Sequence, residues 1–309
     1  MTRKSNLFNW LFTLLVFSSL TLLTSCEDDE EEEIVEFVTI ADALAADFDF
    51  SILNEALIRT DLMSDLDADG SLTLLAPPDE AFINAGITNL DRFTDDELRD
   101  ILQYHVIAGD VLYSEFDRRS IETLNGNLYV SSNLQRIYLN GETNFVQINY
   151  RASNGIVHTI DQVLMPPQSS VVQIVTEDDD LSIAQAAIEK AGLASTLNGD
   201  GPFTLFVPTD YAFNILFEDL GVSGIDEISS TELANILQYH AIEARSFSTD
   251  LEAGMQPTTL EGESFRVLFD FNIFLIDENE SNDNARIVQD NKLATNGVIH
   301  KINRVLLPE

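Results

Sequence analysis

The sequence predicts an α+β protein built from two homologous domains in tandem. Three observations support this prediction. The chain has 309 residues, which suits two domains of ordinary size. Three sequence blocks occur twice in the same order, and in each copy helical patterns precede strand patterns. Hydrophobic residues make up 45% of the chain, so each half can bury a core of its own.

The repeated blocks lie at nearly constant offsets. The first block occupies residues 72–82 and 203–213, the second residues 98–105 and 233–240, and the third residues 154–164 and 296–306. The offset between the copies grows slightly from the first block to the third, which fits small insertions in loops, where added length costs little. The blocks place the following residues in equivalent positions: Pro77 and Pro208, Phe82 and Phe213, Tyr104 and Tyr239, His105 and His240, Asn154 and Asn296, Gly155 and Gly297, His158 and His300.

The first block predicts a strand followed by a helix. Residues 65–70 and 198–202 have the composition of turns. The segment Leu72–Ala76 is almost wholly apolar, which predicts a strand buried on both faces. Pro77 should end this strand, and Asp79 should begin a short helix that places Phe82 in the core.

The second and third blocks predict a helix and the closing strands. Residues 94–97 and 229–232 read as capping boxes, with Glu three residues after Thr or Ser. The apolar residues that follow have helical spacing up to His105 and His240. Alternation over residues 145–150 and 265–269 predicts strands. Each Asn-Gly pair predicts a turn before a closing strand that ends near Pro166 or Pro308.

The N-terminus has the pattern of a bacterial lipoprotein signal. Basic residues at positions 3 and 4 precede an apolar run over residues 7–23, and two small residues precede Cys26, the one cysteine of the chain. Such a pattern describes a secretory signal rather than a transmembrane helix. Leu, two small residues and Cys resemble a lipobox, in which the cysteine is acylated and held on the membrane. The sequence therefore predicts a signal peptide over residues 1–25 and lipidation at Cys26.

An acidic run follows this cysteine. Residues 27–33 are all Asp or Glu, and because like charges repel, residues 26–36 are predicted to form an extended tether. The run resembles the acidic export signals of surface lipoproteins in Bacteroidetes. We therefore expect an outer-membrane lipoprotein exposed on the cell surface, with a periplasm-facing orientation as the alternative. The two domains are expected at residues 37–167 and 168–309.

The charge of the chain excludes some partners. Its 53 acidic and 16 basic residues give a formal net charge of −37, which disfavours nucleic acid and anionic lipid. Contact with a membrane is therefore expected through the lipid anchor only. Two interpretations of the acidity stay open, namely a solvated, self-repelling surface and a surface that binds cations or basic partners.

The three blocks together resemble the fasciclin-type adhesion domain, FAS1. Members of this family show T-x-F-x-P-T-x-x-A-F, a Tyr-His pair after an amphipathic helix, and N-G-V-[IV]-H followed by V-L-L-P. The resemblance covers residues 37–308 and implies a compact sandwich of short β-strands with a layer of short helices. It also implies adhesion through extracellular protein or polysaccharide. The Asp-Ile pair of integrin-binding animal members is missing from residues 290–296, so integrin binding is not carried over.

The four histidines are the candidate site residues, two in each repeat. A metal or catalytic pair, a pH sensor, and a framework of buried neutral imidazoles are the three interpretations. The framework is favoured, because no repeated Ser or Cys stands beside the histidines to act as a nucleophile. The resemblance links the Tyr-His pair with adhesion. The interaction candidates are therefore Tyr104, His105, Tyr239 and His240, and the other repeated Pro, Phe, Asn, Gly and His residues are expected to be structural.

Catalytic and metal-binding motifs are not recognisable. Residues 65–70 imitate the start of an EF-hand loop, but Ala76 stands where a bidentate Glu belongs. Residues 277–284 read as a polar hairpin tip. Phosphate loops, nucleophile elbows and zinc spacings are absent from the sequence. We expect no cofactor, no metal and no enzymatic activity.

The sequence therefore predicts a surface-anchored adhesion lipoprotein that binds matrix protein or polysaccharide. The first alternative is a glycan-binding accessory lipoprotein of a nutrient-uptake system. The second is a hydrolase or metal enzyme. The ligand, the domain that binds it and the oligomeric state are left open by the sequence.

Overall fold

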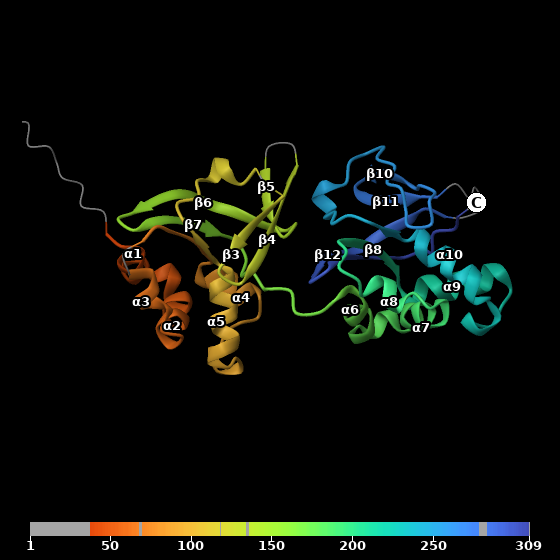
Figure 1. Cartoon of the computed structure of the whole chain (residues 1–309), viewed down its shortest axis with the longest axis horizontal. Helices are drawn as coiled ribbons and strands as arrows, with labels where there is room; N and C mark the ends of the chain where they lie inside the picture. Colours follow the sequence, from red (N-terminus) through yellow and green to blue (C-terminus); the bar gives the residue numbers. More distant parts are fainter. Residues whose placement is uncertain (1–37, 68–69, 118, 134–135, 278–282, 309) are drawn as a thin grey trace, which may run out of the picture. The chain divides into compact units, whose positions relative to one another are not determined.

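The computed structural model of the chain describes residues 38–67, 70–117, 119–133, 136–277 and 283–308 (Figure 1). The chain divides into two units, Met1–Glu36 and Phe37–Glu309, and both repeats belong to the second. The signal sequence, the predicted lipidation residue Cys26 and the acidic run lie outside the described residues. Within the described residues, no helix has both the length and the apolar character needed to cross a membrane.

The first repeat begins with helices and continues with strands, as its sequence predicts. Its helices are α1 (Ile40–Ala46), η1 (Phe48–Phe50), α2 (Ser51–Arg59), α3 (Leu62–Asp67), α4 (Asp79–Asn84), η2 (Leu90–Arg92), α5 (Asp95–Tyr104) and η3 (Tyr113–Glu115). Its strands are β1 (Leu72–Ala76), β2 (Val106–Ala108), β3 (Ser120–Thr123), β4 (Gly126–Asn133), β5 (Arg136–Leu139), β6 (Thr143–Ala152) and β7 (Gly155–Ile160).

The second repeat has the same order of elements. Its helices are α6 (Val171–Glu177), η4 (Asp179–Leu181), α7 (Ser182–Ala191), α8 (Ala194–Leu197), α9 (Asp210–Leu220), η5 (Ile225–Glu227), α10 (Ser230–Tyr239) and η6 (Ser248–Asp250). Its strands are β8 (Phe203–Pro208), β9 (Ala241–Ile242), β10 (Arg266–Asp270), β11 (Asn272–Ile276), β12 (Ala285–Ala294) and β13 (Gly297–Ile302).

Each repeat contains one sheet with helices against one face (Figure 1). The strand orders are β2-β1-β7-β6-β5-β4-β3 and β10-β11-β12-β13-β8-β9. The two edge strands of the first sheet, β2 and β3, meet, so the sheet curls. The backbone N–H of Leu124, just after β3, donates to the carbonyl of Val106 in β2 over 2.9 Å. In the second sheet Leu260 donates in the same way to Ala241 over 2.8 Å. The predicted sandwich of short strands is therefore a single curled sheet that encloses apolar side chains.

The curl gives each repeat two clusters of buried apolar residues. In β1, Leu74 and Ala76 belong to the cluster beneath the helices, and Leu75 belongs to the cluster inside the curled sheet. In β8, Leu205 lies beneath the helices and Phe206 inside the sheet. Successive strand residues point to opposite faces, so both faces of these strands are buried. This explains why the two segments are nearly continuous apolar runs. Each of the four clusters draws its residues from one repeat only.

Several predicted element boundaries need correction. Asp65 and Asp67, predicted in a turn, lie in helix α3. β8 continues through Pro208, whereas β1 ends before Pro77 as predicted. The closing strands β7 and β13 end at Ile160 and Ile302 rather than near the prolines, and each pairs in parallel with the first strand of its repeat. Parallel pairing needs a long crossover connection, which the helices and remaining strands of the repeat provide.

The predicted helix starts are confirmed in detail. The Thr94 hydroxyl accepts the Glu97 backbone N–H over 3.2 Å, and a Glu97 carboxylate oxygen accepts the Thr94 N–H over 2.8 Å. The Thr94 backbone N–H and hydroxyl lower the pKa of Glu97 below its usual range. At α10 the structure gives one bond of the predicted capping box, in which the Ser229 hydroxyl accepts the Glu232 N–H over 3.2 Å. These bonds satisfy backbone donors that the first helical turn leaves unpaired.

Candidate functional site

The histidine of each Tyr-His pair is buried where the helix ends. The His105 Nδ1–H donates to the Ile101 carbonyl over 2.8 Å, and Nε2 accepts the Leu164 backbone N–H over 2.9 Å. This assignment leaves the ring neutral, because one nitrogen donates and the other accepts. Burial lowers the pKa of His105 to about 4. The imidazole thus connects the end of α5 with the segment that follows the closing strand.

His240 repeats this arrangement in the second copy. Its Nδ1–H donates to the Ile236 carbonyl over 2.7 Å, and its Nε2 accepts the Leu306 N–H over 2.9 Å. Burial lowers its pKa to about 4 as well. In both repeats, one neutral imidazole therefore joins the Tyr-His block to the end of the third block.

The histidines of the closing strands are also fully engaged. His158 accepts the Asn149 N–H at Nδ1 over 3.2 Å and donates from Nε2 to the Val111 carbonyl over 2.9 Å. His300 accepts the Asn291 N–H over 3.3 Å and donates to the carbonyl of Ser246 over 2.9 Å. Burial lowers the pKa of both rings. With both nitrogens of all four rings occupied, the histidines form a framework in this structure.

The tyrosines of the Tyr-His pairs are buried too. The Tyr104 hydroxyl donates to the Asn127 carbonyl over 2.9 Å, and the Tyr239 hydroxyl donates to the Ser264 carbonyl over 3.1 Å. Burial raises the pKa of Tyr104 to about 12. All four interaction candidates are at most 3% exposed, so they shape the fold beneath the surface. Their part in binding a partner stays a prediction.

Asn154 and Asn296 lie in the predicted turns, and their side chains also bind the ends of helices. The Asn154 side-chain oxygen accepts the Ile40 N–H at the start of α1 over 2.9 Å, and its amide donates to the Leu66 carbonyl of α3 over 2.6 Å. Asn296 likewise accepts the Val171 N–H over 3.0 Å and donates to Leu197 over 2.9 Å. Each asparagine therefore fastens two helix ends to the sheet.

The Asp of the first block has a structural role that sequence reasoning missed. Asp79 accepts the Ile52 N–H over 2.8 Å, and Asp210 accepts the Ile183 N–H over 2.8 Å. Each carboxylate thereby caps a helix that precedes the first strand of its repeat. The occurrence of this Asp at the same position in both copies could have indicated its structural role. Phe82 and Phe213 lie in the same helical core, as predicted, and are 3% and 0% exposed.

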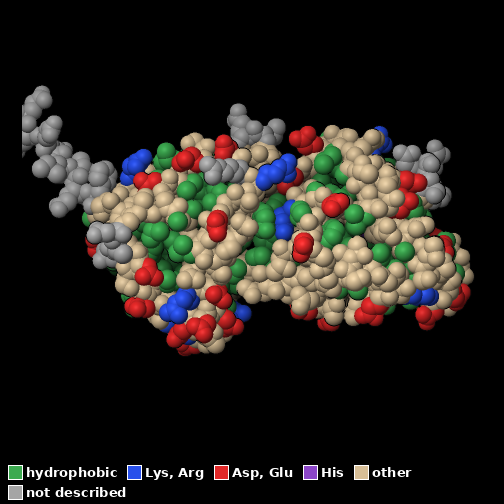
Figure 2. Space-filling view, viewed as in Figure 1, with side chains coloured by type: hydrophobic (Ala, Val, Ile, Leu, Met, Phe, Trp, Pro, Cys, Tyr) green, Lys and Arg blue, Asp and Glu red, His purple; other side chains and the backbone are tan. Residues whose placement is uncertain are grey.

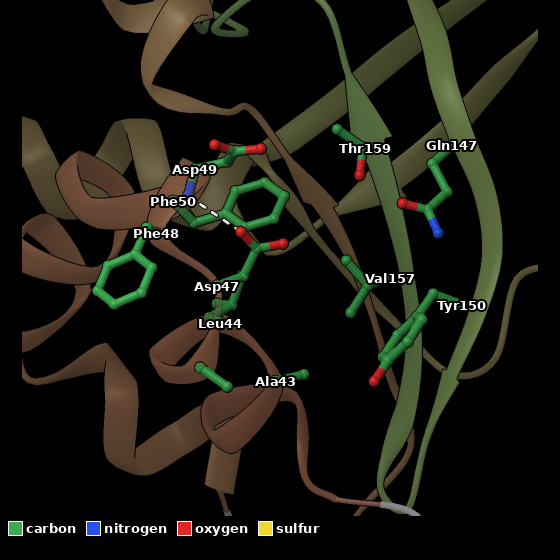
Figure 3. A pocket seen from close by; sticks show the side chains of 11 residues that line it. Ala43, Leu44, Asp47, Phe48, Asp49, Phe50, Gln147, Tyr150, Val157 and Thr159 are labelled. Carbon is green, nitrogen blue, oxygen red and sulfur yellow. Dashed lines mark hydrogen bonds between the residues drawn. The ribbon is translucent and has the colours of Figure 1, made fainter.

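A pocket of about 490 Å³ opens on the first repeat, where α1 and η1 face β6 and β7 (Figure 3). The Asp47 carboxylate projects from the helical side toward Tyr150 and Val157 on the strands. Tyr150 is 42% exposed and the neighbouring Phe48 is 92% exposed. Exposed aromatic side chains around a hollow with apolar walls and a few polar groups mark a candidate binding surface. Its other principal lining residues are Asp49, Phe50, Gln147 and Thr159.

Acidic side chains are scattered over the face of the molecule drawn in Figure 2. Among the described residues, no group of three or more His, Cys, Asp or Glu side chains is placed to hold a metal ion. The incomplete EF-hand pattern begins inside helix α3, which is not the loop geometry that calcium coordination needs. The acidic surface is therefore a source of long-range attraction for basic molecules.

The fold and its buried framework define a protein of two homologous domains, in which repeated polar residues fasten helices to the sheet within each domain. Residues 48–166 and 179–308 each match the Fasciclin domain, and the chain belongs to this family. The predicted resemblance is thereby confirmed. The predicted α+β class of two tandem domains is confirmed by the order of helices and strands in each repeat.

Relatives of the chain carry the same domain. The chain is 30% identical over 261 residues to transforming growth factor-beta-induced protein ig-h3 of Sus scrofa, a match that covers 80% of this chain and 36% of the relative. It is 30% identical over 260 residues to periostin of Homo sapiens, covering 80% and 30%. The chain thus spans about a third of the length of these curated relatives. A solved FAS1 domain pair from the insect cell adhesion molecule Fasciclin I aligns with a TM-score of 0.43 at 21% identity, covering 84% of this chain and 97% of the pair.

Proposed function

We propose that the chain is a surface-anchored adhesion lipoprotein that binds extracellular protein or polysaccharide through its paired fasciclin domains. The observation that carries this proposal is the presence of two fasciclin domains, a domain that occurs in adhesion and matrix-interacting proteins. The engaged histidines support a binding role rather than catalysis, because none presents a ring nitrogen to a substrate.

The N-terminal sequence supports the anchored part of this proposal. The lipobox-like residues before Cys26 and the acidic run after it would attach the protein to the outer membrane and hold the domains away from it. Binding by each module can then be modest. Two modules on one anchor, and many anchors on one cell, multiply the avidity by about 10²–10⁴ where the geometry allows simultaneous contacts.

Deleting the gene is expected to reduce attachment of cells to immobilised matrix proteins and polysaccharides. A Cys26→Ser variant should reproduce this loss, because without an acylated cysteine the same domains are not held on the cell surface. The measurements are cell counts on coated surfaces and the distribution of the protein between membrane and medium. Protease treatment of intact cells should remove the domains if they are displayed outward.

Two outcomes would contradict this proposal. Unchanged attachment and aggregation after deletion would argue against adhesion. Saturable binding of a soluble oligosaccharide by calorimetry, combined with unchanged attachment, would favour the glycan-binding accessory instead. Complementation with the wild-type gene controls for effects on neighbouring genes.

A further inference from the structure

The two repeats differ in the strand residues that face an equivalent aspartate. Asp47 in the first repeat corresponds to Asp178 in the second, with the same offset as the two copies of the first block. On the closing strands, Thr159 corresponds to Lys301, with the same offset as the two copies of the third block. Strand pairing supports this equivalence, because Thr159 and Lys301 each pair with a glutamine of the preceding strand.

In the second repeat, the aspartate binds an ammonium group of its own domain. The Lys301 Nζ lies 2.7 Å from Asp178 Oδ2 and 3.4 Å from Asp180 Oδ2, and the Lys292 Nζ lies 4.0 Å from Asp178 Oδ2. Lys301 is 8% exposed. Burial alone would raise the pKa of Asp178, but the Lys301 ammonium, the Asp180 N–H and the charge of Lys292 lower it below its usual value. This carboxylate therefore stays ionised beside a bound amine.

In the first repeat, the equivalent carboxylate of Asp47 has the same local conformation as that of Asp178. Asp47 Oδ1 accepts the Asp49 N–H over 3.0 Å, just as Asp178 Oδ1 accepts the Asp180 N–H over 3.2 Å. Both aspartates are N-caps of short 3-10 helices. The second oxygen of Asp47 is therefore oriented as the Asp178 oxygen that binds Lys301. Within the described part of the chain, no basic side chain forms an ion pair with Asp47.

Uncharged residues take the places of the two lysines in the first repeat. Thr159 stands in place of Lys301, and Tyr150 in place of Lys292, since Tyr150 and Lys292 pair with equivalent residues of the closing strands. The shorter Thr159 side chain lines the pocket between Asp47 and the strands (Figure 3). Tyr150 adds an aromatic ring at its edge, and an aromatic face attracts a cation.

We propose that this pocket of the first domain binds a primary ammonium group, namely the side chain of a lysine on a basic partner protein. The partner's ammonium takes the place beside Asp47 that Lys301 takes beside Asp178. Tyr150 and Val157 contact the alkyl stem, in the way that lysine stems lie along apolar surfaces. The net charge of −37 attracts basic partners to this surface. This inference rests on the proposed binding function and names the chemistry of its partner.

The lysines in the described part of this chain do not supply the ligand. Lys190 donates to the carbonyls of Ile225 and Asp226 over 2.8 and 3.0 Å. Lys301 and Lys292 lie beside Asp178. The described lysines thus have partners within their own domain, and the proposed occupant is a lysine of a second protein species.

The test measures binding of a short glycine–lysine peptide to the full chain by calorimetry and by NMR. Peptides with arginine or norleucine in place of lysine are the ligand controls. The Asp47→Asn variant should bind the lysine peptide at least about tenfold more weakly, the loss expected for a charged hydrogen bond. Its amide oxygen still accepts the Asp49 N–H, so its unfolding midpoint should stay close to that of the wild type.

Two further variants separate the pocket from general electrostatics. Thr159→Lys gives the first domain a lysine at the position of Lys301. Because this lysine would pair with Asp47, we expect loss of peptide binding and a higher unfolding midpoint. Asp42→Asn removes the same charge from a position of α1 that does not line the pocket. It should change the affinity less than about twofold, because a charge outside the pocket acts on the peptide only through screened solvent. Absence of lysine-peptide binding to the wild type, or equal effects of Asp47→Asn and Asp42→Asn, would overturn the proposal. Cell attachment that is lost on deletion but kept in Asp47→Asn would overturn this site while leaving adhesion intact.

Discussion

Acidification from pH 6.5 to pH 4 is expected to lower the free energy of unfolding by about 3 kcal/mol for each of His105 and His240. Both rings are buried with a pKa of about 4, whereas an imidazole in the unfolded chain has a pKa near 6.5. Well above pH 6.5 both states are neutral and the stabilisation is complete. Between pH 6.5 and pH 4 the unfolded chain binds protons that the folded chain does not, so stability falls with pH. Urea unfolding followed by circular dichroism at several pH values measures this slope.

A His105→Gln variant isolates the contribution of one ring. Its amide can reach the same two backbone groups but does not titrate, so the variant should be less stable at pH 7 and lose less stability on acidification. The difference between the two pH profiles should approach about 3 kcal/mol at pH 4. Other titrating groups, including Glu142 and Asp250, whose pKa values burial raises, cancel in this comparison. Parallel profiles would show that the folded state accepts a proton on His105, contrary to the structure.

These histidines are poor candidates for sensing pH near neutrality. A ring with a pKa of about 4 stays neutral between pH 6 and pH 8, where a physiological switch would have to operate. Charging it would require breaking the bond from the Leu164 N–H, since a protonated ring has no acceptor nitrogen. Of the three interpretations that the sequence allows, the structure supports the framework.

A Gly155→Ala substitution is expected to destabilise the first domain by about 3 kcal/mol or more. A Cβ atom at this position would lie 1.9 Å from the carbonyl oxygen of Leu72 and 2.9 Å from its carbonyl carbon. Both atoms belong to the backbone of β1, which pairs with β7 in the middle of the sheet, so neither can move without disturbing the parallel pairing. Thermal and urea unfolding of the full chain measure the loss.

Two other glycines serve as comparisons. Gly297→Ala should act in the same direction in the second domain, because its Cβ would lie 2.4 Å from the Phe203 carbonyl oxygen. Gly224→Ala should have an effect within about 0.5 kcal/mol, since no atom lies within 4 Å of its Cβ position and its backbone is extended. If Gly155→Ala were as mild as Gly224→Ala, the close pairing of β1 with β7 would be wrong.

The sequence could predict the features that depend on neighbouring residues. The capping box at Thr94, the helix up to His105 and the buried strand Leu72–Ala76 are all correct. Each depends on hydrogen bonds or side-chain periodicity between near neighbours, which a single segment contains. The internal duplication allowed further structural residues to be predicted, because a residue found at the same place in both copies is expected to have the same role in both domains. Repetition therefore marked the correct framework residues without showing their contacts.

The candidate pocket depends on contacts that no local pattern contains. Asp47 and Thr159 are far apart in the chain, and they meet because α1 and η1 pack beside β7. The Asp47 signal was present in the repeat, since both copies have Asp-x-Asp at this point. The difference that matters is Lys301 in one copy and Thr159 in the other. The effect of this difference on the pocket can be seen only in the structure, where the strand register places Thr159 and Lys301 opposite the aspartates.

By itself, the sequence determined that the body of this protein is one α+β unit used twice, with the Tyr-His and Asn-Gly blocks as its framework. Only the tertiary structure decided that the first and closing strands pair in parallel, that Gly155 is required by the backbone of β1, and that one domain has an open acidic pocket where the other holds a lysine. The physical reason is range. Propensity, capping and periodicity act over a few residues, whereas strand pairing and ion pairs join residues that the chain brings together only when it is folded.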